Sequence, residues 1–408
     1  MFKTHALLYL KALCILMLVV PQAINSSAQS EKILHSFVAG QVGDGYFPQA
    51  GLILDSKGNL YGTTYYGGTA SNYCSNCGTV FELSLGANAT WTEQVIYSFG
   101  VSSSDGENPV GGVTLDRKGN LYGTTQAGGT EFSGTVYQLI PGQSGTWTEN
   151  VLYNFKGSSD GCFPSGGLVL DSGGNIYGMA EECGALGYGV VFELVPGQGG
   201  TWTEKVLHSF TGGNDGELPY AITLTLDGQG NLYGVSRLAG SHDYGVVFEL
   251  MHGTWTEKIL YAFTGGGTGI APIGGLAIDS VGNLYGVTQY LAFELSPSPK
   301  GAWTETVLHN FTGGSDGAYP SAQLVFDKAG SLYGTTFTGG HHLGTVFKLK
   351  PGVNGVWTEK VLYAFQPNGG DGASPEYGTL AIDATGNLYG TTQNGGASNF
   401  GTVFELTQ

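Results

Sequence analysis

The stretch that decides the fold is Asp55-Ser-Lys-Gly-Asn-Leu-Tyr-Gly-Thr-Thr64, because close copies of it recur along the whole chain. The seven copies lie about 55 residues apart and centre on Tyr61, Tyr122, Tyr177, Tyr233, Tyr285, Tyr333 and Tyr389. Self-similarity at such a period is typical of a repeat architecture. Each repeat holds four strand-like runs joined by Gly-rich turns and shows no sustained helical period, which predicts a propeller blade of four antiparallel strands.

The two ends of the chain predict how the blades form a ring. The fourth run of a repeat begins with Trp and ends with Phe, as in Trp91 to Phe99, and a further copy of it stands alone at 31–37. The last repeat stops after its third run, Gly401 to Leu406. Because natural proteins avoid open sheet edges, we expect the strand at 31–37 to complete the last blade. The prediction is an all-β, seven-bladed β-propeller that forms a single domain over residues 29–408.

Charge and the first residues indicate where the protein works. Lys3 and Lys11 precede an apolar run, and small residues precede Gln29, so residues 1–28 read as a cleaved signal peptide. We therefore expect a secreted or periplasmic protein that is not inserted in a membrane. A formal net charge of −17 makes nucleic acid a poor partner. We expect a monomer whose partner is a glycan or an extracellular protein.

The repeat resembles a known family. Gly58 to Thr64 with Gly78 to Leu83, and Gly386 to Thr392 with Gly401 to Leu406, are similar to the unit of the GloVer tandem-repeat proteins, a family of secreted bacterial proteins. The resemblance covers nearly the whole chain after residue 28 and implies a β-propeller of unassigned activity. The Asp-Xaa-Xaa-Gly-Asn-Leu-Tyr turn is also similar to turns of lactonase-type and NHL-type propellers, but a shared turn does not carry function.

Two sets of aspartates repeat around the predicted ring. Those that open the tight turns, from Asp55 to Asp383, are expected to bond the amides of their own turn. A second set stands before the inner strand, each member followed by Gly, and comprises Asp44, Asp105, Asp160, Asp215, Asp316 and Asp371. Asp-Gly is an ordinary turn dipeptide, and the alternative is a weak Ca²⁺ site made of carboxylate oxygens. We expect no other cofactor.

The cysteines and the inner strands carry separate predictions. Cys74 with Cys77, and Cys162 with Cys183, are expected to form disulfides in an oxidising compartment. The middle positions of the inner strands, such as Ile53 and Thr114, are uncharged throughout, so we assign no catalytic residue to the central channel.

The histidines divide into two groups. His35, His208 and His309 occupy an outer-strand position that is Tyr in other copies, and we interpret them as packing variants. The fifth repeat has lost the loop between its second and third runs, around Tyr290, which predicts a notch in the ring. The candidate binding site is Tyr290 together with the residues expected to flank this notch, namely Arg237, His242, Asp243, His341 and His342.

Three functions follow from these features. The leading hypothesis is a secreted, non-catalytic propeller that binds a glycan or a protein partner through the face carrying its long loops. The first alternative is a lactonase-like propeller hydrolase or lyase, either with or without a catalytic metal. The second alternative is a structural repeat protein of the cell surface.

Overall fold

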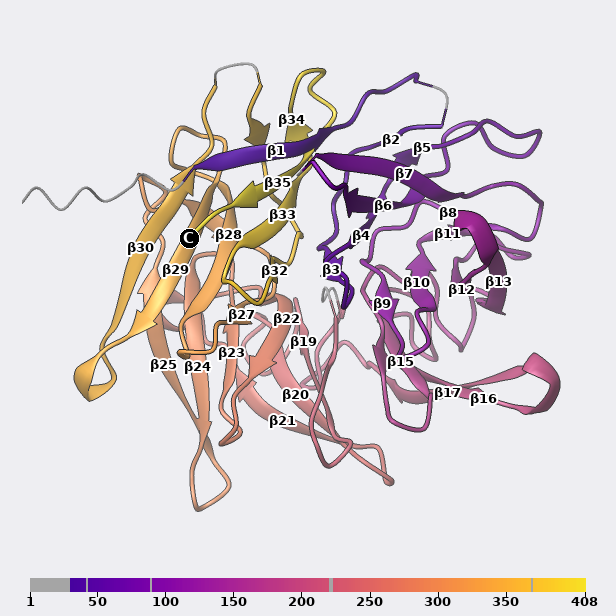
Figure 1. The fold of residues 1–408 in the computed structure, drawn as a ribbon. Coiled ribbons are helices and arrows are strands. Elements are labelled where there is room, and N and C mark those ends of the chain that lie inside the picture. Colours follow the sequence, from indigo (N-terminus) through magenta and orange to yellow (C-terminus); the bar gives the residue numbers. More distant parts are fainter. Residues whose placement is uncertain (1–29, 42, 89, 220–222, 368–369) are drawn as a thin grey trace, which may run out of the picture.

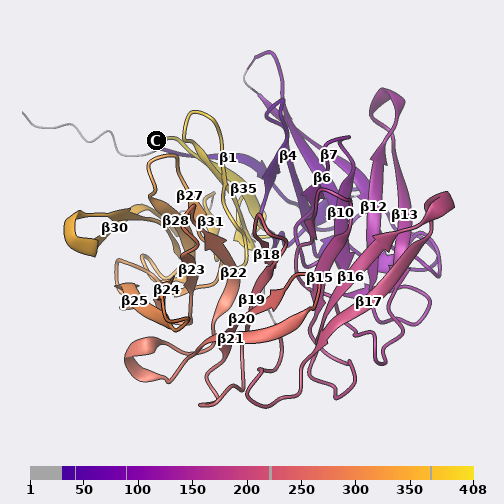
Figure 2. The same ribbon diagram turned by 90° about the horizontal axis from the view of Figure 1, so that it is seen from below.

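The computed structural model describes residues 30–41, 43–88, 90–219, 223–367 and 370–408. Seven antiparallel sheets follow one another around a central axis, as the views in Figure 1 and Figure 2 show. The chain is an all-β, seven-bladed propeller. The signal peptide predicted for residues 1–28 lies outside the described residues. No helix in the described part of the chain is long and apolar enough to cross a bilayer.

Each blade has four principal strands, which we number from the axis outwards. The first strands are short and comprise β3 (Ile53–Leu54), β9 (Thr114–Leu115), β14 (Val169–Leu170), β18 (Thr225–Leu226), β22 (Ile273–Ile278), β27 (Val325–Phe326) and β32 (Ala381–Ile382). The second strands carry the Leu-Tyr-Gly run and comprise β4 (Leu60–Thr64), β10 (Leu121–Thr125), β15 (Ile176–Ala180), β19 (Leu232–Ser236), β23 (Leu284–Val287), β28 (Leu332–Thr338) and β33 (Leu388–Thr392).

The outer half of each blade is longer. The third strands are β6 (Thr79–Leu85), β12 (Thr135–Pro141), β16 (Val190–Pro196), β20 (Val246–Met251), β24 (Leu291–Pro297), β29 (Thr345–Pro351) and β35 (Thr402–Leu406). The fourth strands are β7 (Trp91–Ser98), β13 (Trp147–Asn154), β17 (Trp202–Ser209), β21 (Thr256–Ala262), β25 (Trp303–Asn310), β30 (Trp357–Ala364) and β1 (Glu31–Ser36). Helical structure among the described residues consists of the 3-10 turns η1 (Gln143–Gly145), η2 (Gln198–Gly200), η3 (Gly266–Thr268) and η4 (Val353–Gly355).

The two ends of the chain meet in the seventh blade. Strand β1 pairs antiparallel with β35, from Glu31 opposite Leu406 to Ser36 opposite Thr402, and Figure 1 shows the two strands side by side. The seventh blade also joins the first, because Thr391 Oγ1 donates a hydrogen bond of 2.8 Å to the carbonyl of Ala50. The sheet order β1-β35-β33-β32 is therefore that of a complete blade whose fourth strand comes from the start of the chain.

One glycine per blade sets the core packing. The glycine of Leu-Tyr-Gly faces a large ring on the third strand, and Gly62 lies opposite Phe81. A β-carbon on Gly62 would be 2.6 Å from Phe81 Cζ. Phe81 is fully buried, as are its equivalents Tyr137, Phe192, Phe248, Phe293, Phe347 and Phe404. The repeated Tyr-Gly pair therefore leaves room for the aromatic ring that fills each blade.

Short extra strands mark one face of the disc. On this face the loop between blades pairs with the loop between the second and third strands of the same blade. The pairs are β2 (Gly45–Tyr46) with β5 (Tyr66–Gly67), β8 (Gly106–Glu107) with β11 (Ala127–Gly128), β31 (Gly372–Ala373) with β34 (Asn394–Gly395), and β26 (Ala318–Pro320) with β28. We call this the long-loop face, and the opposite side, with the Asp-Xaa-Xaa-Gly-Asn turns, the tight-turn face.

Candidate binding face

On the tight-turn face, the aspartate of each turn motif accepts hydrogen bonds from groups within its own turn. Asp55 Oδ1 accepts bonds from the N–H groups of Lys57 (2.8 Å) and Asn59 (2.9 Å), and its Oδ2 accepts from Asn59 Nδ2 (3.0 Å). The same pair of backbone bonds recurs at Asp116, Asp171, Asp227, Asp279, Asp327 and Asp383. These carboxylates close their turns and form part of the scaffold.

The same motif holds neighbouring blades together. Trp147 of the second blade lies edge-on to Tyr61 of the first, with ring centroids 6.1 Å apart. Trp91 of the first blade contacts Tyr389 of the seventh in the same way, at 6.0 Å. Such edge-to-face pairs contribute beyond the area that they bury. The tryptophans therefore have a structural role at the joints between blades.

The central channel offers no acid–base chemistry at its narrow part. A cavity of about 140 Å³ on the axis is lined by inner-strand residues such as Ile53, Thr114 and Gln323. None of the described residues that line it carries an ionisable side chain. Thr63 and Thr124 donate hydrogen bonds to the carbonyls of Gly111 (3.1 Å) and Gly166 (2.9 Å) in the next blade, so their hydroxyls are structural.

The long-loop face carries a ring of residues that the sequence analysis missed. One residue per blade, directly before a proline, has a positive φ between 48° and 58°. These residues are Phe47, Asn108, Phe163, Leu218, Ala271, Tyr319 and Ser374, and we call them the mouth ring. A positive φ is unusual for large side chains and is found where the surroundings impose it. The signal in the sequence was a proline at the same place in every repeat, preceded by a residue that changes.

Hydrogen bonds fix the mouth ring in place. The N–H of Phe47 donates to the carbonyl of Phe400 in the preceding blade (2.9 Å), and its own carbonyl accepts from Tyr65 N–H (3.1 Å). Asn108 makes the equivalent bonds, to Cys77 (2.7 Å) and from Gln126 (3.0 Å). The following proline packs on a glycine of the preceding blade, since a β-carbon on Gly401 would be 2.5 Å from Pro48 Cδ. The backbone is thus uniform while the side chains differ from blade to blade.

A second set of variable side chains lies at or just beyond the ends of the second strands. It comprises Tyr65, Gln126, Glu181, Arg237, Gln289, Phe337 and Gln393. Members from adjacent blades interact: Tyr65 donates a hydrogen bond to Gln126 Oε1 (3.2 Å), and Arg237 acts electrostatically on Glu181. Burial raises the pKa of Glu181 to about 7, against the lowering effects of Ser165 and Arg237. Aromatic, amide and charged groups therefore alternate at equivalent positions of the blades on this face.

Aromatic side chains gather at two places on the long-loop face. Between the seventh and first blades, Tyr46 contacts Tyr66 and Phe400, with centroids 5.5 and 5.6 Å away. Between the fifth and sixth blades, Tyr290 and Tyr319 are 44% and 41% exposed, and their rings lie 5.8 Å apart. Tyr290 stands where other blades have a glycine. Its carbonyl accepts a hydrogen bond from the N–H of Phe311, just as the carbonyl of Gly78 in the first blade accepts one from the N–H of Phe99.

The residues predicted around the notch lie at the surface in separate loops. The short loop of the fifth blade is present, closed by a bond from Thr288 N–H to the Leu291 carbonyl (2.8 Å). Arg237, His242, Asp243, His341 and His342 are all exposed, and His242 Nδ1 lies 2.9 Å from Ser241 Oγ. Among the described contacts, His242 and His341 share no hydrogen bond, ion pair or ring contact. The notch therefore stays a prediction, and Tyr290 is its member with an aromatic neighbour.

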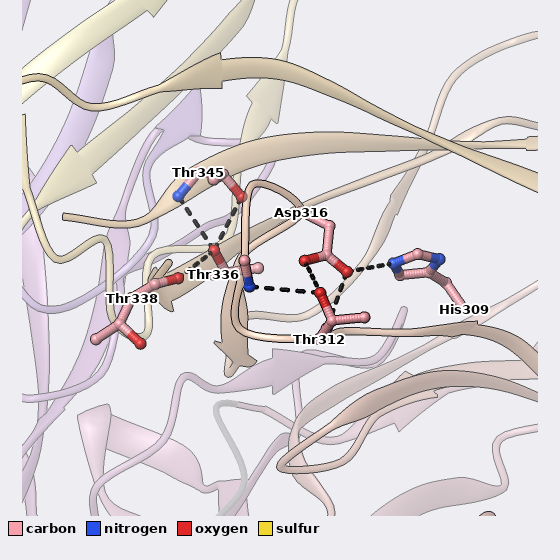
Figure 3. A network of polar contacts seen from close by, with 7 residues as sticks. His309, Thr312, Asp316, Thr336, Thr338 and Thr345 are labelled. Atoms are coloured by element: carbon pink, nitrogen blue, oxygen red, sulfur yellow. Dashed lines mark hydrogen bonds and ion pairs between the residues drawn. The ribbon is translucent and has the colours of Figure 1, made fainter. Parts of the chain in front are cut away.

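The six loop aspartates do not surround one mouth. Each lies in a separate cluster beside the fourth strand that precedes it. Asp105 Oδ2 accepts Tyr97 OH (3.0 Å) and Val101 N–H (2.9 Å), and Asp160 and Asp371 are held by Tyr153 and Tyr363 in the same way. Where the tyrosine is replaced by histidine, Asp316 Oδ2 lies 3.3 Å from His309 Nε2 and also accepts Thr312 N–H, as Figure 3 shows. In the fifth blade, Thr268 Oγ1 accepts Thr264 N–H instead.

A glutamate from the following fourth strand completes each cluster, and the sequence analysis missed it. The seven are Glu31, Glu93, Glu149, Glu204, Glu257, Glu305 and Glu359, and the buried Oε1 of each has no hydrogen-bond partner. Burial raises the pKa of Glu149 and Glu204 to about 7. The signal was the repeated Trp-Thr-Glu, in which alternation puts Trp and Glu on one side of the strand. We call these groups the rim clusters.

Both predicted disulfides are present. Cys74 is bonded to Cys77, and Cys162 to Cys183. Both bridges hold loops of the long-loop face, and they indicate an oxidising compartment, extracellular or periplasmic.

The fold and the two faces define a repeat-built β-propeller with a uniform scaffold and a variable long-loop face. The profile of the Gloeobacter/Verrucomicrobia repeat family matches residues 22–145, 69–292 and 291–408, and the chain belongs to this family. A search of curated proteins finds no significant match.

Solved structures share the fold. Virginiamycin B lyase from Staphylococcus aureus superposes with a TM-score of 0.54 and 12% identity over 93% of this chain and 100% of that one. A putative 6-phosphogluconolactonase from Bacteroides uniformis gives a TM-score of 0.50 and 14% identity over 92% of each chain. At such identities the likeness concerns the propeller alone.

Proposed function

We propose that this protein is a secreted binding protein that recognises a glycan through its long-loop face. One observation carries the proposal: the mouth ring presents seven backbone-equivalent positions with seven largely different side chains. A scaffold that keeps its geometry and varies its loop residues is the usual design of a recognition surface. An extracellular protein is the second kind of partner that such a surface would suit.

The chemistry of the face favours a carbohydrate. Tyr290 and Tyr319 together offer exposed aromatic faces on which a sugar ring can stack. Gln126, Gln289 and Gln393 offer amides, and Glu181 and Arg237 offer charged groups, that can pair with sugar hydroxyls. We include the predicted notch residues His242, Asp243, His341 and His342 as the outer edge of the same site.

A glycan array with the purified protein tests this proposal. We expect saturable binding to a small set of related glycans. The control is a variant with Tyr290→Ala and Tyr319→Asn, in which asparagine tolerates the positive φ at position 319. Equal binding by this variant, or no glycan bound by the parent protein, would count against the proposal.

A second candidate is a hydrolase or lyase, and Glu181 is the observation in its favour. A half-buried carboxyl whose pKa is raised to about 7, within electrostatic reach of an arginine, suits general acid–base catalysis. Activity towards lactones that disappears in Glu181→Gln would support an enzyme. Glycan binding that survives the same substitution would support the binding protein.

A further inference from the structure

The rim cluster between the seventh and first blades differs from the other described clusters in that one carboxylate oxygen of its aspartate has no hydrogen-bond partner. It contains His35 from β1, Asp44 from the loop between blades, and Glu93 from β7, whose ligand atoms all lie within 4.8 Å of one another. The cluster of His208, Asp215 and Glu257 has the same spacing, so the difference lies in the hydrogen bonds of the aspartate. Asp44 is 6% exposed, and its Oδ1 has no hydrogen-bond partner. That oxygen lies 3.6 Å from His35 Nε2, which also lacks a hydrogen-bond partner, as does Glu93 Oε1.

The other clusters show how this carboxylate is normally satisfied. A tyrosine hydroxyl bonds the aspartate in three of them, at Asp105, Asp160 and Asp371. In the other two histidine clusters, a threonine hydroxyl donates to Oδ1, from Thr211 to Asp215 (2.5 Å) and from Thr312 to Asp316 (2.6 Å). Val38 stands at the threonine position beside Asp44 and can donate only its N–H, to Oδ2 (3.0 Å).

Three buried polar atoms that face one another, each without a hydrogen-bond partner, make a costly arrangement unless a ligand joins them. We propose that His35, Asp44 and Glu93 form a binding site for one Zn²⁺ ion. One imidazole nitrogen and two carboxylate oxygens form a three-ligand set of the kind that zinc takes, with the fourth position left to water. Ca²⁺ prefers six to eight oxygen ligands, which this cluster does not offer.

The surroundings leave room for that water and hold the imidazole. Asp44 and Glu93 line a cavity of about 570 Å³ that is open to solvent beside β7. The His35 ring lies edge-on to Phe37, with centroids 4.6 Å apart. The interpretation of His35 as a packing variant accounts for this ring contact. It does not account for Nε2, which lies near Asp44 and Glu93. A bound ion would tie β1, the first described strand of the chain, to the first blade.

Four blades supply a substitution that the fold already accepts. The position of His35 is Tyr97, Tyr153, Tyr261 and Tyr363 elsewhere, so His35→Tyr removes the imidazole and gives Asp44 a hydroxyl donor. His208→Tyr is the matched control, because Asp215 already has both oxygens bonded to Thr211.

The test measures Zn²⁺ binding to EDTA-treated full-length protein. Titration calorimetry gives the affinity, and the metal content after dialysis gives the stoichiometry. We expect one equivalent in the parent protein and in His208→Tyr, with an affinity at least about 100-fold weaker in His35→Tyr. Zn²⁺ should raise the Tm of the parent but not of His35→Tyr. Unchanged binding in His35→Tyr, or no binding by the parent, would overturn the proposal.

A second variant guards against misfolding. Glu93→Gln keeps the size of the side chain and removes its charge, and we expect it to lose Zn²⁺ while keeping the circular dichroism of the parent. Retained stoichiometric binding in Glu93→Gln would also overturn the assignment. Co²⁺ in place of Zn²⁺ gives a direct readout, since its visible absorption should show tetrahedral coordination in the parent and in His208→Tyr, and not in His35→Tyr or Glu93→Gln.

Discussion

The ring of Phe81 lies directly over Gly62, so that a β-carbon at position 62 would come within 2.6 Å of Phe81 Cζ. The other copies of the repeat place a large ring over the same glycine. This relationship explains why the Leu-Tyr-Gly run recurs, and it shows that the run serves the core of the blade rather than a site.

Gly62→Ala should therefore destabilise the protein. Forcing an extra carbon against a fully buried ring costs about 1–3 kcal/mol in the free energy of unfolding. Gly228→Ala is the matched control, because a β-carbon there meets no atom within 4 Å, and its stability should stay close to that of the parent. Urea unfolding measures both. Equal stability of the two variants would contradict this account of the packing.

Tyr137→Phe should stabilise the second blade. Tyr137 is fully buried and its hydroxyl has no hydrogen-bond partner, whereas six blades carry phenylalanine at this position. Removing an unsatisfied buried hydroxyl should raise the free energy of unfolding by about 1 kcal/mol.

The comparison is Tyr177→Phe on the second strand of the third blade. The Tyr177 hydroxyl donates to Asp171 (3.2 Å) and lies 3.1 Å from Glu193, so its loss should destabilise by about 1 kcal/mol. Opposite signs in the two variants are the expected result of thermal or urea unfolding. A loss of stability in Tyr137→Phe would mean that its hydroxyl has a partner.

The rim clusters should make stability depend on pH. Burial raises the pKa of Glu149 and of Glu204 to about 7 in the folded protein, while the unfolded chain has the ordinary value near 4.5. The folded state then binds more protons than the unfolded state between these values, so stability falls as the pH rises through this window. The stabilising contribution of the two protonated carboxyls is fully present below about pH 4.5. Above about pH 8 both carboxyls are ionised in both states, and their effect on stability no longer changes with pH.

The measurement is Tm at pH 5 and pH 8 in the presence of EDTA. We expect the higher Tm at pH 5, and a smaller difference in the double variant Glu149→Gln, Glu204→Gln, because glutamine does not titrate. A Tm that is equal or higher at pH 8 would show that these carboxylates are not desolvated.

The fold followed from the sequence because every level of the repeat agrees. The spacing of Tyr61 and its copies predicted seven blades. The copy of the fourth run at 31–37, which lacks the initial Trp, was predicted to join the last blade, whose own fourth run is missing. The disulfides were predictable because Cys162 and Cys183 fall in loops of one blade. The exact bounds of the strands were less predictable. Trp255 has a positive φ and lies just outside β21, although the equivalent Trp begins the fourth strand in other blades.

The site was harder to predict, since it depends on contacts between repeats. Phe47 is unremarkable in the sequence, and only the bonds to Phe400 and Tyr65 reveal that it belongs to a ring. Glu93 has no assigned role in the sequence analysis, yet it lies beside Asp44 and His35 in a rim cluster. The notch was predicted from a missing loop, with His242 and His341 on either side of it in loops of blades four and six, and it stays a prediction.

The central claim is that the variable long-loop face binds a ligand. The most direct measurement is the affinity of the best glycan from the array for the parent and for Tyr290→Ala, with Tyr73→Ala as the control. Tyr73 is also an exposed loop tyrosine, at 61%, but lies in the disulfide-bonded loop of the first blade. We predict that Tyr290→Ala weakens binding about tenfold or more, equal to about 1.4 kcal/mol, and that Tyr73→Ala leaves it unchanged. Equal affinity of all three proteins would contradict the account.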